Sequence, residues 1–330
     1  MSAAPPILSV RDLSVRFATR RGSVEAVRGV SFEVAAGRSL GLVGESGSGK
    51  SQTCYAIMGL MPGNATVGGS ARLEGEQLVG ATRARLDALR GRRMGLVFQD
   101  PMTALTPHMT VGAQLCEILA YHEGAGSAEA RRRALEIMER VRITDPERRF
   151  EMYPFELSGG MRQRIVIATA LVLRPALLIA DEPTTALDVT VQAEVLRTFR
   201  AVVEHTGTSL VLVTHDLGVV AGACDEVAVM YAGRIVERAA TADLFHAPAH
   251  PYTRALLACR PRLDDPPVAR LRTIEGQPPS LAGREDDGCA FAPRCGFAQA
   301  ACHSQRPALL TRRAADGTTR EVACHLDAPP

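Results

Sequence analysis

Hydrophobic residues along this chain follow two patterns, one typical of strands and one typical of helices. Alternating apolar residues predict strands at 8–10, 30–34 and 95–98, all in the first hundred residues. Residues 101–172 favour helices, and 128–142 carries apolar positions at helical spacing. Strand and helix patterns then alternate, with strands predicted at 176–180, 209–214 and 227–231 and a helix at 189–203. This alternation predicts an α/β fold with a mainly parallel sheet covered by helices.

One short apolar strand, residues 39–43, leads into a glycine-rich loop followed by a proline-free segment that favours a helix. The loop fits the pattern G-x-x-x-x-G-K-[ST], for which chance odds in a chain of this length are roughly one in a hundred. Its residues are Gly44, Glu45, Ser46, Gly47, Ser48, Gly49, Lys50 and Ser51. Glycines and a helix N-terminus turn backbone N–H groups toward an anion, Lys50 reaches the β/γ-phosphates, and Ser51 offers an oxygen to Mg²⁺. A surface turn is the alternative, but the context favours binding of a nucleoside triphosphate.

Two further sequence patterns, later in the chain, suggest residues that act together with this loop. Ser158, Gly159 and Gly160 open a predicted helix, which alone indicates only a well-capped helix. One helix later, the apolar strand 177–180 ends in Asp181 and Glu182. The carboxyl end of a buried strand is where α/β sheets bind ligands, so this pair suggests a metal or proton-transfer task. A solvated strand end is the weaker alternative.

Composition narrows the possible functions. The 330 residues allow two domains, or one large domain with an extension, and 46% hydrophobic residues allow a sizeable core. The net charge of +2, the absence of Trp and the lack of a basic run give no indication of nucleic-acid binding. No targeting segment is evident, and the longest apolar stretch, 165–173, is about half a membrane span. We expect an intracellular protein that does not itself cross a bilayer.

Four of the eight cysteines gather near the C-terminus, after a proline-rich stretch at 259–288. They are Cys289, Cys295, Cys302 and Cys324. In a cytosolic protein such a group favours a metal over disulfides, although the spacing lacks the paired C-x2-C of common zinc sites. Zinc, an iron–sulfur cluster and free thiols all remain open on spacing alone.

Taken in order, these motifs resemble the ATP-binding subunit of an ABC transporter. The resemblance spans nearly the whole chain: the loop at 44–51, Gln99, the signature at 157–163, Asp181 with Glu182, residues 186–188 and His215. It implies a P-loop NTPase cassette, with a RecA-like core, an antiparallel β subdomain and a helical subdomain. By this resemblance the cassette covers 1–258, with the helical subdomain at about 101–172, and a small Cys-rich extension covers 259–330.

The resemblance also implies roles for the site residues. Asp181 would hold Mg²⁺ through water, with Ser51 and Gln99 completing its shell. Glu182 would be the general base that polarises the attacking water, and His215 would sense the γ-phosphate. A non-catalytic regulatory subunit would be expected to lack Glu182 or His215, and both are present.

Family members pair head-to-tail, so that the signature of one subunit closes over ATP held by the other. This implies that Ser158, Gly159, Gly160 and Asp188 belong to the nucleotide site as well. Phe17 is the candidate for stacking on adenine, although a core position for this residue is nearly as plausible. Residues 100–109, with two prolines and apolar side chains that look exposed, would receive a permease; the alternative is a loop packed on the helical subdomain.

Residues 249–256, 276–281, 288–295 and 322–325 look like the C-terminal extension of oligopeptide/dipeptide importer ATPases. In that subfamily the four tail cysteines are implied to ligate a [4Fe–4S] cluster. The signature looks like the first of the two ATPase subunits. The implied partners are a second ATPase in a head-to-tail heterodimer, two permeases and a solute-binding protein, at the cytoplasmic side of the inner membrane. Peptides are the default cargo, nickel or another small solute is the alternative, and a soluble ABC ATPase acting on nucleic acid or ribosomes is the distant rival.

Overall fold

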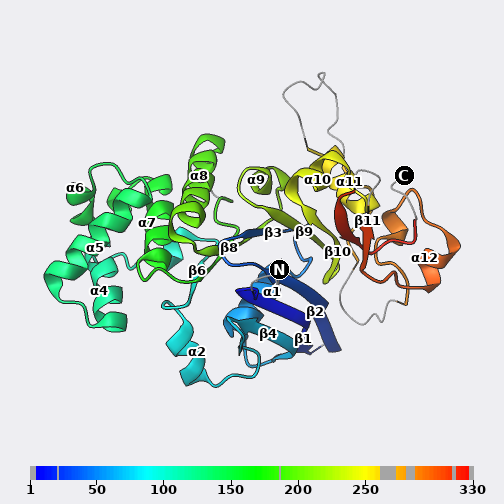
Figure 1. The fold of residues 1–330 in the computed structure, drawn as a ribbon, viewed down its shortest axis with the longest axis horizontal. Helices are drawn as coiled ribbons and strands as arrows, with labels where there is room; N and C mark the ends of the chain where they lie inside the picture. The colour runs from blue at the N-terminus through cyan, green and yellow to red at the C-terminus, as the bar shows by residue number, and fades with distance from the viewer. Residues whose placement is uncertain are drawn as a thin grey trace.

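The computed structural model describes residues 5–20, 22–185, 187–260, 273–279, 287–313 and 317–326. Two sheets and a group of helices make up its architecture (Figure 1). The larger sheet has eight strands, in the spatial order β11 (Leu310–Arg313), β12 (Thr319–Val322), β10 (Arg234–Ala240), β9 (Glu226–Tyr231), β3 (Ser39–Val43), β8 (Ser209–Thr214), β7 (Leu177–Asp181) and β6 (Met94–Val97). The five strands from β9 to β6 are parallel, as the sequence predicts. The three at the other edge are antiparallel, which the sequence does not predict.

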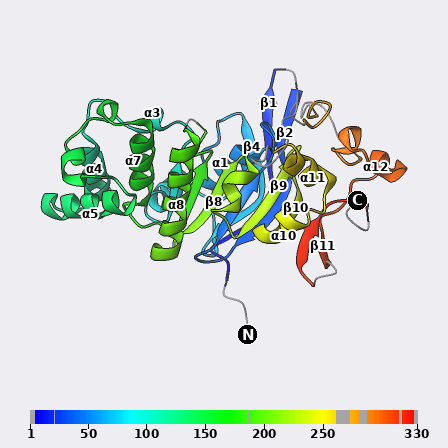
Figure 2. The same cartoon turned by 90° about the horizontal axis from the view of Figure 1, so that it is seen from above.

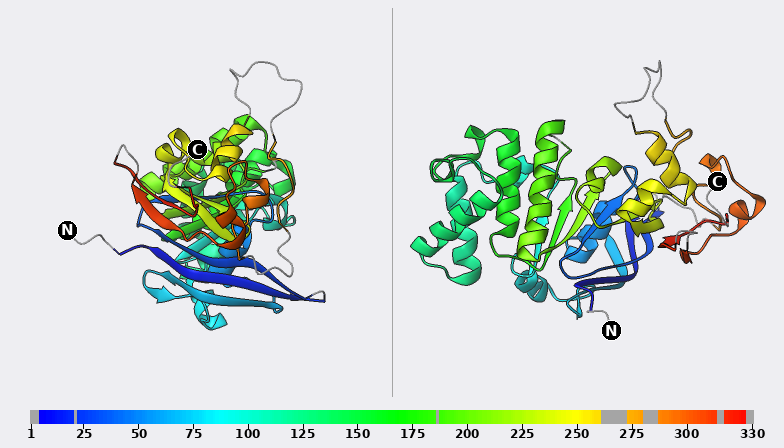
Figure 3. Two further views of the ribbon diagram at one scale, coloured as in Figure 1. Left: turned by 90° about the vertical axis from the view of Figure 1, so that its right-hand side faces the viewer. Right: turned by 45° about the horizontal axis from the view of Figure 1, so that its top comes forward.

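The smaller sheet is antiparallel, in the order β2 (Gly22–Val34), β1 (Leu8–Thr19), β4 (Ala65–Leu73) and β5 (Glu76–Gln77). It forms a layer of its own beneath the larger sheet (Figure 3). Helix α1 (Lys50–Met58) packs on both, because one apolar core joins Ile57 to strand residues such as Val10 and Leu42. The phosphate-loop helix is therefore held between two sheets.

Helices fill one end of the molecule, seen on the left of Figures 1 and 2. They are α3 (Pro101–Ala104), α4 (Val111–Glu123), α5 (Ser127–Arg140), α6 (Pro146–Phe150), the 3-10 turn η1 (Pro154–Glu156) and α7 (Gly159–Leu171). Local signals set their ends: Thr110 caps the start of α4 by accepting from the Ala113 N–H, and Gly124 ends it with φ of 67°. All of these helices lie between residues 101 and 171, in the part of the chain whose sequence favours helices.

The remaining helices surround the sheets. They are α2 (Arg83–Leu89), α8 (Val189–Thr206), α9 (Leu217–Ala221), α10 (Thr241–His246), α11 (Pro251–Ala258), η2 (Ala292–Arg294) and α12 (Ala300–Ser304). The segment after 287 does not stand apart from the rest, because β12 pairs with β10 at Glu237↔Val322 and Arg238↔Glu321. Within the described residues, no helix is long and apolar enough to cross a membrane.

Candidate functional site

The glycine-rich loop joins the end of β3 to the start of α1. Gly49 is the N-cap of α1 with φ of 101°, a backbone conformation that side chains disfavour. A Cβ at Gly44 would lie 2.2 Å from the Met230 carbonyl oxygen, so only glycine fits there. The Lys50 side chain folds back over the loop, and its Nζ donates to the carbonyl oxygens of Gly44 (2.8 Å) and Glu45 (3.0 Å). Burial lowers the pKa of Lys50.

The first of the two predicted carboxylates faces this loop. Asp181 is the last residue of β7 and is 1% exposed. Its Oδ1 accepts a hydrogen bond of 2.9 Å from Ser51 Oγ in α1. Burial raises the pKa of Asp181, while the hydrogen bonds from Ser51 and Tyr55 lower it. A serine hydroxyl and a buried carboxylate in contact are oxygen donors of the kind that Mg²⁺ prefers.

The second carboxylate collects three polar partners on one oxygen. Glu182 Oε2 lies 3.3 Å from Gln99 Nε2, 3.2 Å from His215 Nδ1 and 2.9 Å from Thr185 Oγ1. The backbone of Glu182 has φ of 46°, in the left-handed region, and its N–H donates to Val213 O at 2.9 Å. The resemblance implied that Gln99 and His215 belong to the same nucleotide site as Glu182, whereas Thr185 carried no signal.

Ser158 of the signature and Asp188 cap helices other than α1. Ser158 Oγ accepts from the Met161 N–H at 3.3 Å at the start of α7, and Ser158 and Gly159 are exposed. Asp188 caps α8 by accepting from the Val191 N–H at 3.0 Å. α7 lies toward the helical end in both Figures 1 and 2, apart from α1. Ala186, named with Asp188 in the sequence, lies outside the described residues.

One apolar position of the 100–109 segment differs from the exposed appearance that the sequence gives it. Leu105 was expected to face a permease, but it is 5% exposed and belongs to the core of the helical region. The expected exposure of Leu105 was wrong because a short apolar pattern cannot distinguish a docking loop from one that packs on its own helices. A permease contact of residues 100–109 stays a prediction. The side chain of Met102, its companion, lies outside what the structure describes. Phe17 lies on β1, partly buried against the core between the sheets.

The C-terminal segment reaches the phosphate loop, which the sequence reasoning missed. The Arg294 guanidinium pairs with the Glu45 carboxylate, at 2.7 Å from Nη1 to Oε2 and 3.0 Å from Nη2 to Oε1. The Glu45 N–H donates to the Tyr252 hydroxyl at 3.0 Å. Glu45 and Arg294 are separated by 249 positions, so no local pattern could connect them.

The four tail cysteines line one small cavity together with His250 and His325. Each of the four sulfurs accepts a hydrogen bond from at least one backbone N–H group. The Gln299 N–H, for example, lies 3.5 Å from Cys302 Sγ. Burial raises the pKa of Cys289, Cys295 and Cys324, and the neighbouring cysteines raise it further. In the part of the chain that the structure describes, however, no three His, Cys, Asp or Glu side chains are close enough to hold a metal ion as placed.

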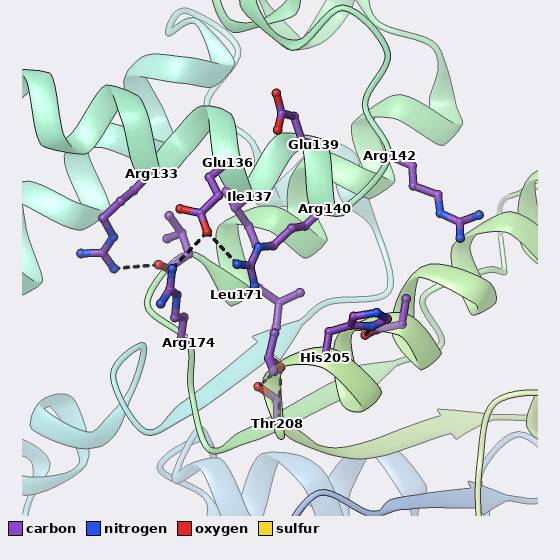
Figure 4. Close-up of a pocket in the computed structure, with 13 residues that line it drawn as sticks. Arg133, Glu136, Ile137, Glu139, Arg140, Arg142, Leu171, Arg174, His205 and Thr208 are labelled. Atoms are coloured by element: carbon purple, nitrogen blue, oxygen red, sulfur yellow. Dashed lines mark hydrogen bonds and ion pairs between the residues drawn. The ribbon is translucent and has the colours of Figure 1, made fainter.

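Another cavity, of about 480 Å³, lies where α5, α7 and α8 end (Figure 4). Several arginines line it, but they serve local contacts: Arg133 donates to Val172 O at 3.1 Å, and Arg140 and Arg174 pair with Glu136. Helix C-termini carry partial negative charge, which arginines offset. These arginines therefore have a structural explanation, and nothing about the cavity indicates a ligand.

Comparison with known proteins places these features in context. The family model described as "ABC transporter" matches residues 27–185, and the one described as "Oligopeptide/dipeptide transporter, C-terminal region" matches 236–302. The chain is 48% identical over 301 residues to the oligopeptide transport ATP-binding protein OppD of Salmonella typhimurium, covering 91% of this chain and 89% of that protein. The corresponding OppD of Bacillus subtilis is 47% identical over 306 residues, covering 92% and 85%.

Solved structures agree with the fold. The dimeric ATP-binding cassette MJ0796 bound to ADP and Pi superposes with a TM-score of 0.64 at 26% identity, covering 71% of this chain and 98% of that one. CbiO1 of Clostridium perfringens gives a TM-score of 0.63 at 25% identity, covering 74% and 92%. The predicted cassette fold, with its antiparallel β and helical parts, is confirmed.

Proposed function

Because this chain belongs to the ABC transporter family of ATP-binding subunits, in its oligopeptide/dipeptide branch, we propose that it hydrolyses ATP to drive the import of di- and oligopeptides. The observation that carries this proposal is the contact between the phosphate loop and Asp181, the first of two carboxylates at the end of the buried strand β7. Ser51 contacts Asp181 directly, and Glu182 follows next in the chain. Phosphoryl transfer needs positioning and charge stabilisation at one point, which this arrangement offers.

In the proposed reaction, the loop from Gly44 to Ser51 binds the triphosphate through backbone N–H groups and Lys50. Ser51, Asp181 and Gln99 would hold Mg²⁺, which neutralises charge on the phosphates when bound. The hydroxyl–carboxylate contact of 2.9 Å between Ser51 and Asp181 fits such a donor set. Phe17 would stack on the adenine.

Glu182 is the proposed general base, and its surroundings support that role. Gln99, Thr185 and His215 all lie within hydrogen-bond reach of its Oε2, so the carboxylate is oriented before substrate arrives. The side chain of His215 is 50% exposed, compared with 13% for Glu182. An exposed imidazole beside a sheltered carboxylate suits a residue that senses a phosphate entering from solvent.

The proposed assembly is a head-to-tail pair with a second ABC ATPase. In it, Ser158, Gly159, Gly160 and Asp188 of this chain would complete the nucleotide site of the partner subunit. The exposure of Ser158 and Gly159 at the start of α7 supports this, because a helix N-terminus at the surface can reach a nucleotide held by another subunit. The similar cassette MJ0796 is described as dimeric. Two permeases and a solute-binding protein would complete the transporter at the cytoplasmic side of the inner membrane.

We further propose that Cys289, Cys295, Cys302 and Cys324 hold a [4Fe–4S] cluster within an extension spanning 259–330. Their shared cavity and the backbone N–H groups around the sulfurs suit a thiolate-bound cluster, since such hydrogen bonds tune iron–sulfur sites. Binding would require the sulfurs to move closer than they stand. Anaerobically purified protein should contain about four irons per chain, and Cys302→Ser should remove them while ATP binding survives. A stoichiometric amount of zinc without iron would mean that the four cysteines bind zinc and not a cluster. The absence of both iron and zinc would refute the proposal.

The function is tested by reconstituting the chain with its second ATPase, the two permeases and the binding protein in proteoliposomes. ATP hydrolysis should rise when di- or oligopeptides are supplied, and peptide uptake should disappear in a Lys50→Ala variant. Stimulation by nickel in place of peptides would favour the alternative cargo. Stimulation of the chain by nucleic acid or ribosomes, without permeases, would overturn the assignment as a transporter subunit.

A further inference from the structure

Arg294 stands out among residues outside the predicted nucleotide site, because every nitrogen of its guanidinium donates hydrogen bonds. The side chain is 4% exposed. Besides both oxygens of Glu45, it donates from Nε to Glu275 O at 3.0 Å and from Nη2 to Ile274 O at 3.2 Å. Nη1 also donates to the Tyr231 hydroxyl at 3.3 Å. A guanidinium has five N–H donors, and here each has an acceptor. Such a side chain is fixed in place.

Glu45, the partner of Arg294, is hydrogen-bonded through its carboxylate, its N–H and its carbonyl oxygen. Its carboxylate receives the two-pronged contact from Arg294, its N–H donates to Tyr252, and its carbonyl oxygen accepts from Lys50 Nζ. Ser48 N–H also donates to the same carbonyl, at 3.1 Å. The position of Glu45 therefore sets where Lys50 rests and how the loop closes.

A cluster of three aromatic rings packs beside the contact between Arg294 and Glu45. Tyr231, Tyr252 and Phe291 lie with ring centroids 4.6 to 5.3 Å apart, and all three are at most 3% exposed. The Arg294 guanidinium carbon lies 5.8 Å from the Tyr231 ring centroid and 6.0 Å from that of Phe291. Tyr231 ends β9 and Tyr252 lies in α11, so the cluster joins the cassette to the C-terminal segment.

We propose that Arg294 is a positioning residue of the nucleotide site, which sets ATP affinity by holding Glu45 in the phosphate loop. The inference rests on the proposed ATP-binding function and adds the C-terminal segment to the machinery of that site. The sequence suggests no such link, since no ATP-binding motif lies after residue 258. Burial distinguishes the contact from a surface ion pair, which contributes little. Loss of Arg294 would leave Glu45 free to swing and the loop less well formed for phosphate.

The test compares Arg294→Met, Arg294→Lys and Glu45→Gln, with Arg313→Met as a control at an exposed arginine of the same segment. The dissociation constant for MgATP is measured on the purified chain, and KM and kcat on the assembled transporter. Arg294→Met should weaken ATP binding about tenfold or more, as expected for lost hydrogen bonds to a charged group. KM should rise similarly while kcat stays within about twofold, because the contacts of Glu182 are untouched. Arg294→Lys should recover part of the affinity, and the control should match the wild type.

A double-mutant cycle separates positioning from general damage. If Arg294 acts through Glu45, Arg294→Met should add little in a Glu45→Gln background. Fully additive losses, or an unchanged affinity in Arg294→Met, would overturn the inference. If Arg294→Met does not fold, Arg294→Lys and Glu45→Gln decide in the same way: unchanged ATP affinity in both overturns it. Failure of the wild type to bind ATP, or binding insensitive to Lys50→Ala, would instead refute the proposed function itself.

Discussion

Replacing Glu182 by glutamine removes a base while leaving nearly the same shape. Gln99, Thr185 and His215 all approach Oε2, so an amide oxygen at that position keeps three contacts. The ATP dissociation constant should therefore change little. Only the ability to take a proton from water is lost.

The size of the loss follows from the chemistry. General-base catalysis contributes about 10²- to 10⁴-fold, which corresponds to roughly 3 to 5 kcal/mol in the barrier to hydrolysis. Hydrogen bonds to a neutral oxygen are weaker than those to a charged one, so unfolding should become easier by about 1 kcal/mol. For a chain of this size, that lowers the melting temperature by a few degrees. Turnover and stability should thus change by very different amounts.

The assay is ATP turnover of the assembled transporter, alongside ATP binding and thermal melting of the purified chain. Glu204→Gln is a matched control, because Glu204 is an exposed glutamate of α8 paired with Arg200. The Glu182→Gln variant should also accumulate as an ATP-bound dimer. Unchanged turnover would refute the role of Glu182, and a loss of ATP binding equal to the loss of turnover would show that the residue only supports the fold.

Three further outcomes are expected. Gly44→Ala should weaken ATP binding at least tenfold, because the new Cβ would meet the Met230 carbonyl; equal ATP affinity would contradict the loop geometry. Burial lowers the pKa of His250 to about 4, below its usual value, so the unfolded chain binds the proton first as pH falls. The contribution of His250 to the free energy of unfolding should drop by about 1.4 kcal/mol per pH unit between roughly pH 6.5 and 4, seen as the difference between the urea midpoints of the wild type and His250→Gln. Ile57→Ala should cost about 2–5 kcal/mol in the same measurement, while Ile57→Val costs about 1 kcal/mol; equal costs would mean that the core between the sheets is loosely packed.

Local sequence signals were sufficient for much of this molecule. Strand β8 reads as a continuous apolar run because both of its faces are buried, and the glycines of the phosphate loop mark backbone that other residues cannot adopt. The two carboxylates at the end of β7 were expected from the rule that parallel strands present their carboxyl ends at one edge. These features depend on residues close together in the chain.

The features that the sequence does not predict are mostly contacts between residues that lie far apart in the chain. The pairing of Arg294 with Glu45 and of β12 with β10 joins segments whose spacing carries no periodicity. Thr185 likewise gave no signal, because a threonine after a strand has many ordinary explanations. Leu105 was misjudged because exposure is decided by helices that pack over it, not by its neighbours in sequence.

The pairing of β12 with β10 has a consequence for anyone who shortens this protein. β12 covers the outer side of β10, whose Glu237 is fully buried and is held by the N–H groups of Ala249 and His250. A chain cut before residue 259 would present β10 as a bare sheet edge, open to the same edge of another copy. Such a fragment would keep every ATP motif and still carry an edge that favours aggregation. Insolubility of a minimal cassette would then reflect an uncovered strand rather than a defect in its nucleotide site.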